Sequence, residues 1–131
     1  MKTLIVEDDF TSRILLQTFL SRYGECHIAV NGTEAIEAFR AANAGDRGYD
    51  LICMDIMMPE MDGDEALRQI RSIEQAAEIE WEQQVKIVMT TGLDSLRSVS
   101  VSFKDLCNAY LVKPVDTRKL LGHLESFGLV H

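Results

Sequence analysis

The chain has 131 residues, of which 47% are hydrophobic and 26% charged, values typical of one globular domain with a single core. The formal net charge is −8, and without a run of basic residues such a chain is repelled by nucleic-acid phosphates. The amino terminus has too few apolar residues before Glu7 to form a signal peptide or a membrane span. We therefore predict a single cytoplasmic domain over residues 1–131, with no effector domain, no nucleic-acid partner and no membrane contact.

In the first half of the chain, short apolar runs alternate with longer segments of helical period, the pattern of a parallel α/β sheet. Strands are predicted at Thr3–Glu7, His27–Val30 and Leu51–Asp55. A helix at Thr11–Tyr23 should end at Gly24, with an inward apolar face formed by Ile14, Leu15, Phe19 and Leu20. A second helix should follow the N-cap Asn31 and bury Ala35, Ile36, Phe39 and Ala42.

The loop after the third strand contains Pro59 and Gly63, which break both the helical and the strand period. A third helix is predicted to begin near Asp64 and can continue through the acidic segment that ends at Gln83 or Gln84. The glutamates of this segment share a helical spacing, so they predict a solvated face, formed by Glu74, Glu78 and Glu82.

Two further strands are predicted, at Val85–Thr90 and Ala109–Val112. Between them we predict a helix at Asp94–Leu106, although its serine and valine residues have low helix propensity. The last helix should begin at the N-cap Asp116 and bury Leu120, Leu121, Leu124 and Phe127. Cysteines are odd in number and lack metal-ligand spacing, so we predict free thiols in a reducing compartment, at Cys26, Cys53 and Cys107.

Polar residues stand at the carboxyl ends of four predicted strands. Asp8 and Asp9 follow the first strand, Asp55 closes the third, and Thr91 and Lys113 follow the last two. In an open parallel sheet these ends share one edge, where ligands bind and reactions occur. We therefore expect these five side chains to converge in one site.

The residue types at this edge suit phosphoryl chemistry with a divalent cation. Carboxylates at Asp8, Asp9 and Asp55 repel one another unless a cation lies between them, and Mg²⁺ prefers such oxygen ligands. Asp55 is the expected nucleophile, because a carboxylate can form an acyl phosphate. Lys113 would neutralise phosphoryl oxygens, and the Thr91 hydroxyl would donate a hydrogen bond to one of them.

Four short motifs in this order resemble the receiver domain of bacterial two-component response regulators, most closely the stand-alone chemotaxis-type regulators. The motifs are Val6-Glu7-Asp8-Asp9, Met54-Asp55-Ile56-Met57-Met58-Pro59-Glu60-Met61-Asp62-Gly63, Thr90-Thr91-Gly92 and Tyr110-Leu111-Val112-Lys113-Pro114. The resemblance implies a flavodoxin-like α/β fold, a doubly wound five-stranded parallel sheet in the order 2-1-3-4-5 with five helices. It also implies a signalling phosphoacceptor of a phosphorelay rather than an enzyme.

By this resemblance, Asp55 is the phosphoacceptor, and a sensor histidine kinase or a histidine phosphotransfer protein is the donor. Asp9 would bind Mg²⁺ directly and Asp8 would bind it through water, with Mn²⁺ as an alternative ion. The backbone carbonyl of Met57 would complete the metal site, together with Asp55.

The resemblance also assigns a switch. Thr91 would move toward the phosphoryl group, Lys113 would bind that group, and Tyr110 would turn inward. Gly92 stands where alanine is more usual, so the phosphoryl group should be more open to water or a partner. The phosphoryl group would shift the population between two states of the domain. A target protein would distinguish these states at the surface formed by helix four, strand five and helix five. Chemotaxis is one candidate pathway, and the chain could be a monomer or a weak homodimer.

Three other functions would each be accompanied by different residues at this edge of the sheet. A magnesium-dependent phosphatase with an aspartyl nucleophile needs a general acid two residues after it, where this chain has Met57. A flavin-binding protein needs a phosphate-cradling loop after the first strand, where Glu7, Asp8 and Asp9 would repel the phosphate. A degenerate receiver that acts only as a scaffold would lack a reactive residue, and all of the expected residue types are present.

Overall fold

The computed structural model describes residues 1–45, 47–58, 61–92 and 105–131. These residues form a five-stranded sheet in the order β2-β1-β3-β4-β5, and all of its pairs are parallel. The strands are β1 (Thr3–Val6), β2 (Cys26–Ala29), β3 (Leu51–Asp55), β4 (Lys86–Thr91) and β5 (Ala109–Val112). The predicted doubly wound fold and its strand order are confirmed.

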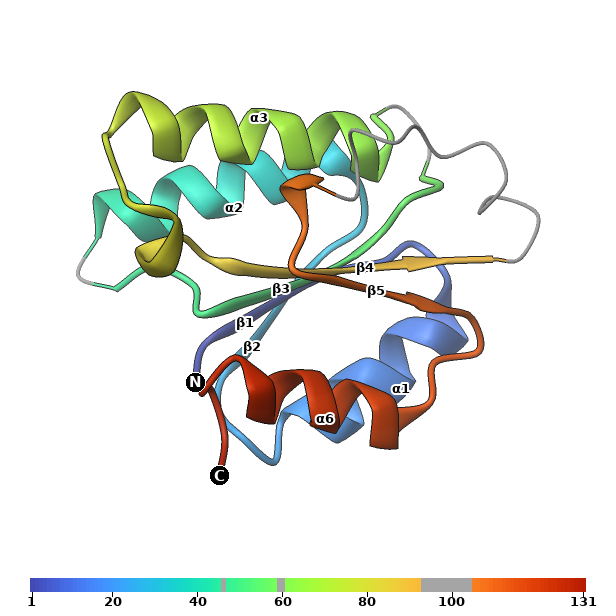
Figure 1. Cartoon of the computed structure of the whole chain (residues 1–131). Helices are drawn as coiled ribbons and strands as arrows, with labels where there is room; N and C mark the ends of the chain where they lie inside the picture. Colours follow the sequence, from blue (N-terminus) through green and yellow to red (C-terminus); the bar gives the residue numbers. More distant parts are fainter. Residues whose placement is uncertain (46, 59–60, 93–104) are drawn as a thin grey trace.

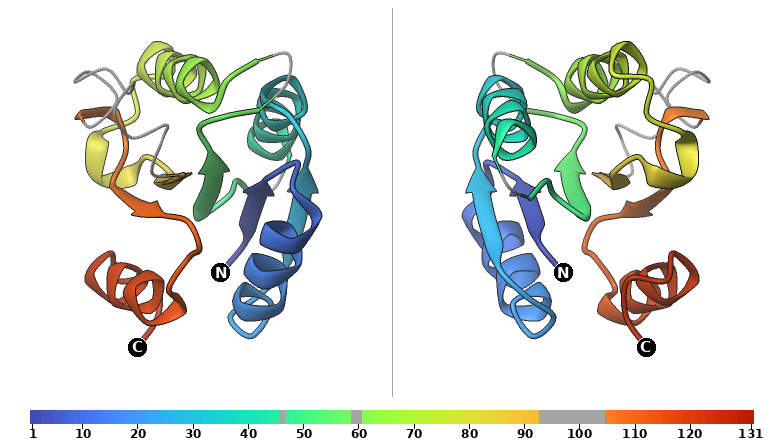
Figure 2. Two further views of the ribbon diagram at one scale, coloured as in Figure 1. Left: turned by 90° about the vertical axis from the view of Figure 1, so that its right-hand side faces the viewer. Right: turned by 90° about the vertical axis from the view of Figure 1, so that its left-hand side faces the viewer.

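Helices cover both faces of the sheet. They are α1 (Phe10–Leu20), α2 (Gly32–Ala44), α3 (Gly63–Ala76) and α6 (Thr117–Ser126), with a short 3-10 helix, η1 (Trp81–Gln83), before β4. α2 and α3 lie on one face, and α1 and α6 lie on the other (Figure 1). The side views show the sheet between these two layers (Figure 2). The helix predicted at Asp94–Leu106 lies, apart from its last two residues, outside the described residues.

Each face of the sheet has its own apolar core, because successive side chains of a strand point to opposite faces. The core under α2 and α3 includes Leu4, Val6, Ile52, Met54, Ile87, Met89, Phe39 and Ile70. The core under α1 and α6 includes Ile5, Leu51, Cys53, Val88, Leu111, Leu16, Leu20, Leu120 and Leu124. β1 and β3 are buried along their whole length, as expected for central strands covered on both faces. None of the described helices is long and apolar enough to cross a lipid bilayer.

The predicted element boundaries are close to the observed ones. The bounds of β3 and β5 are as predicted, β1 ends one residue earlier than predicted, and β2 and β4 are each displaced by one residue at both ends. Two predicted caps are confirmed. The Asn31 side chain accepts a hydrogen bond from the backbone N–H of Glu34 at 2.8 Å, and Asp116 accepts one from that of Arg118 at 2.9 Å.

The predicted inward face of the first helix is partly wrong. Leu16 and Leu20, four residues apart, are buried against the sheet, whereas Ile14 and Leu15 are 42% and 40% exposed. A helix turns only one stripe of its surface toward the core. The stripe through Leu16 and Leu20 therefore leaves Ile14 and Leu15 on the solvent side.

The predicted continuation of the third helix through Gln83 is also wrong. α3 ends at Ala76, and Glu78 has a φ of 58°, a left-handed conformation that cannot continue a helix. The solvated face expected for this segment does not include Glu74, which is 2% exposed. Its carboxylate is paired with the guanidinium of Arg71 at 2.7 Å.

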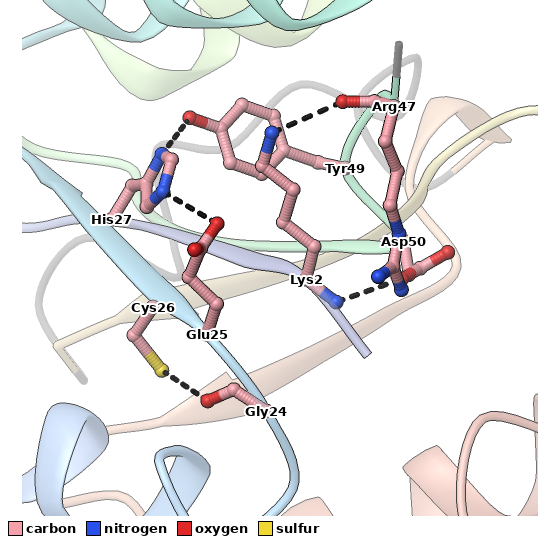
Figure 3. Close-up of polar contacts among 8 residues, drawn as sticks. All are labelled: Lys2, Gly24, Glu25, Cys26, His27, Arg47, Tyr49 and Asp50. Carbon is pink, nitrogen blue, oxygen red and sulfur yellow. Dashed lines mark hydrogen bonds and ion pairs between the residues drawn. The ribbon is translucent and has the colours of Figure 1, made fainter.

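A polar cluster at the amino end of the strands holds the beginning of the chain (Figure 3). The His27 ring lies 2.8 Å from both the Glu25 carboxylate and the Tyr49 hydroxyl. The backbone N–H of Lys2 donates to Asp50 at 2.7 Å, and the Lys2 ammonium lies 4.8 Å from the centre of the Tyr49 ring. These contacts join the starts of β1, β2 and β3 at the edge opposite Asp55.

Candidate functional site

Four strands each direct one polar side chain to the same side of the sheet at its carboxyl edge. These residues are Glu7, Asp55, Thr90 and Lys113, and each comes two positions after a member of the core under α1 and α6: Ile5, Cys53, Val88 and Leu111. The strand pairing extends to Glu7 and Lys113, which follow the last residues of β1 and β5. The backbone N–H of Glu7 donates to the carbonyl of Ala29, and that of Lys113 donates to the carbonyl of Thr91. The period of two along each strand therefore places all four on one face.

Lys113 binds two carboxylates at this edge. Its Nζ lies 2.6 Å from Oε1 of Glu7 and 3.1 Å from Oδ2 of Asp55. Both acids are buried, with Glu7 0% and Asp55 5% exposed. Burial by itself would lower the pKa of Lys113, but the hydrogen bonds to Glu7 and Asp55, together with the negative charges of these two residues, outweigh burial and raise it. The ammonium is therefore a fixed positive charge beside Asp55.

Negative charge nevertheless exceeds positive charge here. Carboxylate oxygens of Glu7, Asp8 and Asp55 all lie within 4.8 Å of one another. Burial raises the pKa of Glu7 from 4.5 to about 7; the hydrogen bond from Lys113 opposes this rise, and the charge of Asp55 adds to it. One ammonium thus leaves three carboxylates incompletely neutralised. Closely spaced oxygen ligands with excess negative charge suit a hard divalent cation.

Asp9, expected to bind the metal directly, lies outside this cluster and caps α1. Its Oδ2 accepts a hydrogen bond from the backbone N–H of Ser12 at 2.9 Å. Hydrogen bonding from Ser12 lowers the pKa of Asp9. The third acid of the cluster is Glu7, which the sequence pattern assigns to the end of the first predicted strand. Its position two residues after Ile5 is the signal that could have identified it.

The structure distinguishes the two adjacent threonines. Thr90 lies directly opposite Asp55 in the β3–β4 register and is 1% exposed. Its Oγ1 has no hydrogen-bond partner among the described residues. Thr91, the expected switch residue, has the opposite parity along β4, and its hydroxyl donates to the carbonyl of Gly92 at 3.1 Å. An unsatisfied buried hydroxyl costs about 1–3 kcal/mol. A ligand that accepts a hydrogen bond from the Thr90 hydroxyl would therefore remove this cost.

Gly63 allows the loop after β3 to close against the end of that strand. Its N–H donates to the carbonyl of Ile56 at 2.8 Å. A Cβ at this position would collide with the carbonyl oxygen of Asp55, so only glycine permits this close approach of two backbones. The glycine of the sequence motif therefore positions the backbone that carries Asp55.

Three other predicted site residues surround this edge. Met57 is 55% exposed, and its N–H donates to Oδ1 of Asp55 at 3.3 Å. A Cβ at Gly92 would meet no described atom within 4 Å. Tyr110 is 41% exposed, and its side chain lies on the opposite side of β5 from that of Leu111. The roles predicted for these three residues stay predictions.

The family described as "Response regulator receiver domain" matches residues 3–125. This chain belongs to that family. The receiver is 32% identical over 127 residues to the chemotaxis protein CheY of Treponema pallidum, covering 95% of this chain and 81% of that protein. It spans only 44% of another relative, the probable transcriptional regulator ycf27 of Cyanidium caldarium.

Solved receiver structures have the same fold. The receiver domain of Ssk1 from Saccharomyces cerevisiae, crystallised with the histidine phosphotransfer protein Ypd1, is 31% identical with a TM-score of 0.77, covering 98% of this chain and 88% of that one. The receiver domain of the sensor histidine kinase PA1611 from Pseudomonas aeruginosa PAO1 is 26% identical with a TM-score of 0.72, covering 97% of both chains. That structure has a magnesium ion coordinated in its active site cleft.

Proposed function

We propose that this receiver is the phosphoacceptor switch of a two-component phosphorelay and that Asp55 is the phosphorylated residue. The observation that carries the proposal is the environment of Asp55. Its buried carboxylate is bound by Lys113, flanked by Glu7 and Asp8, and faced by the unpaired hydroxyl of Thr90. These are the groups that a carboxylate nucleophile needs in order to accept and hold a phosphoryl group.

The donor is a phosphohistidine of a kinase or phosphotransfer protein. A carboxylate oxygen of Asp55 forms the new P–O bond while the P–N bond of the donor breaks. The bonding electrons remain on the imidazole nitrogen, which then takes up a proton. Lys113, already 3.1 Å from Asp55, is placed to stabilise negative charge on the phosphoryl oxygens during this transfer.

Mg²⁺ is the proposed cofactor, with Mn²⁺ as an alternative. The residues proposed to hold it are Glu7, Asp8 and Asp55, together with the backbone carbonyl of Met57. The donor set fits, because three closely spaced carboxylates lack sufficient positive charge and Mg²⁺ prefers oxygen ligands. When bound, the ion neutralises charge on the phosphoryl oxygens. Asp9 has no place in this set, because its carboxylate caps α1.

Thr90, rather than Thr91, is our proposed switch hydroxyl. It is buried and unpaired beside Asp55, so a hydrogen bond to a phosphoryl oxygen would satisfy it. Tyr110 is proposed to respond on β5. Gly92, where a Cβ would meet no atom of the described residues within 4 Å, is proposed to admit water or a partner to the phosphoryl group. Because Thr90 and Lys113 would bond better in the phosphorylated form, they bias a two-state equilibrium toward it.

Apolar side chains beside the site offer a docking surface for the donor. At the start of α1, Phe10 is 66% exposed and Ile14 is 42% exposed, while Met57 lies two residues after Asp55. The similarity to Ssk1, whose receiver was crystallised with a phosphotransfer protein, supports a donor of that class. The similarity to the chemotaxis protein CheY supports motility signalling through a target that binds around β5 and α6.

Phosphorylation by a small-molecule donor tests the proposal directly. With acetyl phosphate and Mg²⁺, intact-protein mass spectrometry should show the addition of one labile phosphoryl group, and Asp55→Asn should abolish it. Asp116→Asn is a matched control, because asparagine caps a helix about as well as aspartate. Absence of a phosphoryl adduct on the wild type, under conditions that preserve acyl phosphates, would refute the proposal.

A further inference from the structure

A second buried ion pair lies at the amino edge of the sheet, far from Asp55. Arg71 and Glu74 of α3 are 6% and 2% exposed, and Nη1 of Arg71 lies 2.7 Å from Oε1 of Glu74. The face of the Trp81 ring covers the guanidinium, whose central carbon lies 4.9 Å from the ring centre. We call Arg71, Glu74 and Asn108 the base clasp, because together they join three segments of the chain.

Each side-chain nitrogen of Arg71 and each carboxylate oxygen of Glu74 has a hydrogen-bond partner. The Arg71 guanidinium donates to the carbonyl of Leu106 at 2.7 Å, to that of Val85 at 2.9 Å and to Oδ1 of Asn108 at 3.0 Å. The second oxygen of Glu74 accepts from the N–H of Val85 at 2.8 Å. The end of α3 is thereby tied both to the entry of β4 and to the residues that lead into β5.

Asn108 connects the clasp to the strand register. Its Oδ1 also accepts from the N–H of Ile87 at 2.8 Å, while its own N–H donates to the carbonyl of Ile87 at 2.8 Å. From this point the β4–β5 ladder continues to the carboxyl edge. There the N–H of Lys113 donates to the carbonyl of Thr91 at 2.7 Å. One end of β5 is thus set by the clasp, and the other end delivers Lys113 to the site.

β5 particularly needs such a fixed point. Among the described residues it is an edge strand of four residues, paired with β4 on one side only. Burial of Ala109 and Leu111 opposes a slip by one residue, which would exchange the two faces. A slip by two residues would preserve the faces and still move Lys113 by about 6.6 Å. That movement would break its contacts with Glu7 and Asp55.

We propose that Arg71, held by Glu74, is a positioning residue for phosphoryl transfer: by binding Leu106 and Asn108 it fixes the register of β5 and so places Lys113 beside Asp55. This inference rests on the proposed function of that site. Stability alone does not account for the clasp, since apolar replacement of a buried ion pair is often neutral or stabilising. A guanidinium with several fixed donors, by contrast, selects one geometry of the groups around it.

The test removes both charges together, with Arg71→Met and Glu74→Met in one chain, so that no buried charge is left unpaired. Arg68→Met is the matched control, because Arg68 is an exposed arginine of the same helix. Asn108→Ala is a second variant that keeps the ion pair and removes the side-chain oxygen that accepts hydrogen bonds from both Arg71 and Ile87. Circular dichroism establishes folding, and NMR cross-strand contacts between Lys113 and Thr91 report the register.

We expect the double variant to fold, to lose the Lys113–Thr91 contact and to accept a phosphoryl group roughly tenfold to 10²-fold more slowly from acetyl phosphate at saturating Mg²⁺. Mg²⁺ affinity should not fall, because its proposed ligands stand at the carboxyl ends of β1 and β3, which the clasp does not touch, and displacement of the Lys113 ammonium leaves more negative charge for the ion. If the double variant does not fold, Asn108→Ala should show the same loss of contact and rate.

A double-mutant cycle separates positioning from general damage. Adding Lys113→Met to the clasp variant should cost little further rate, because the ammonium is already displaced. An unchanged rate with the contact retained, or two rate losses that simply multiply, would overturn the inference. If the wild type accepts no phosphoryl group, the proposed function fails, and the Lys113–Thr91 contact alone then decides whether the clasp fixes the register.

Discussion

Two groups of paired charges stand at opposite ends of the same sheet, and they differ in how completely their charges and hydrogen bonds are satisfied. In the base clasp, one guanidinium meets one carboxylate, and the remaining donors and acceptors bind backbone groups or Asn108. At the carboxyl edge, one ammonium faces the carboxylates of Glu7, Asp8 and Asp55. The charges of the first arrangement balance, whereas the second keeps an excess of negative charge.

This difference indicates which end of the sheet is built for a ligand. A neutral, fully hydrogen-bonded cluster gains nothing from a further ion, and it holds its neighbours in one arrangement. A cluster with excess negative charge and an unpaired Thr90 hydroxyl is improved by a cation and a phosphoryl group. The comparison therefore predicts that a Glu→Gln substitution changes the free energy of unfolding in opposite directions at the two ends of the sheet.

The largest expected effect is at the base. Glu74→Gln should lower the free energy of unfolding by about 3–5 kcal/mol, because it leaves a buried guanidinium without its counter-charge. Chemical denaturation at neutral pH measures the change. Glu82→Gln, on an exposed glutamate of η1, should stay within about 0.5 kcal/mol of the wild type. Equal effects of the two substitutions would show that Glu74 is solvated in solution.

The same substitution at the site should have the opposite sign. Glu7→Gln removes one of three mutually repelling carboxylates and still leaves Asp55 to pair with Lys113. We expect the metal-free protein to gain about 1–2 kcal/mol in the free energy of unfolding above about pH 8, after allowance for solvent screening. A loss of stability would mean that the Glu7–Lys113 pair outweighs the repulsion.

The pH dependence of this gain follows from the raised pKa of Glu7. Between the unfolded value of 4.5 and the folded value of about 7, the unfolded chain has released the proton and the folded chain still holds it. The contribution of Glu7 to the free energy of unfolding therefore falls as pH rises through that interval and is constant above it. The difference between wild type and Glu7→Gln should be close to zero at acidic pH and complete above neutrality.

Mg²⁺ should show the reverse trend. It competes with the proton on Glu7, so its affinity for the wild type should rise as pH increases through about 7. Titration calorimetry at several pH values measures this dependence, which Glu7→Gln should largely remove. An equally steep dependence in the variant would assign the titration to another group.

The smallest effects distinguish Thr90 from Thr91. Thr90→Val should raise the free energy of unfolding by about 1 kcal/mol, because it removes a buried hydroxyl without a partner, whereas Thr91→Val should lower it by about 1 kcal/mol with the loss of its hydrogen bond to Gly92. Beryllofluoride-induced shifts of the Tyr110 resonances should nevertheless be reduced by Thr90→Val and retained in Thr91→Val. The opposite result would restore Thr91 as the switch residue.

The sequence predicted the strand–helix alternation and the sheet edge that carries the site, because buried strands appear as short apolar runs that end in polar residues. Asp55, Asp8 and Lys113 were found in this way and lie together in the structure. The predicted acid pair Asp8–Asp9 is shifted by one residue to Glu7–Asp8 in the structure, and the predicted Thr91 is shifted by one residue to Thr90. Strand ends were uncertain by one residue, and along a strand one residue reverses the face of the side chain.

The base clasp could not be predicted from local pattern. Glu74 has the spacing of a solvated helical face, and its burial depends on Arg71 together with backbone groups 11 and more residues away. The primary structure by itself determined the family, the order of elements and the kinds of polar group at the carboxyl edge, since these depend on local residue pattern. Only the folded chain decided which of the neighbouring polar side chains enter the site and which charges become balanced, since both depend on strand register and on contacts between distant segments.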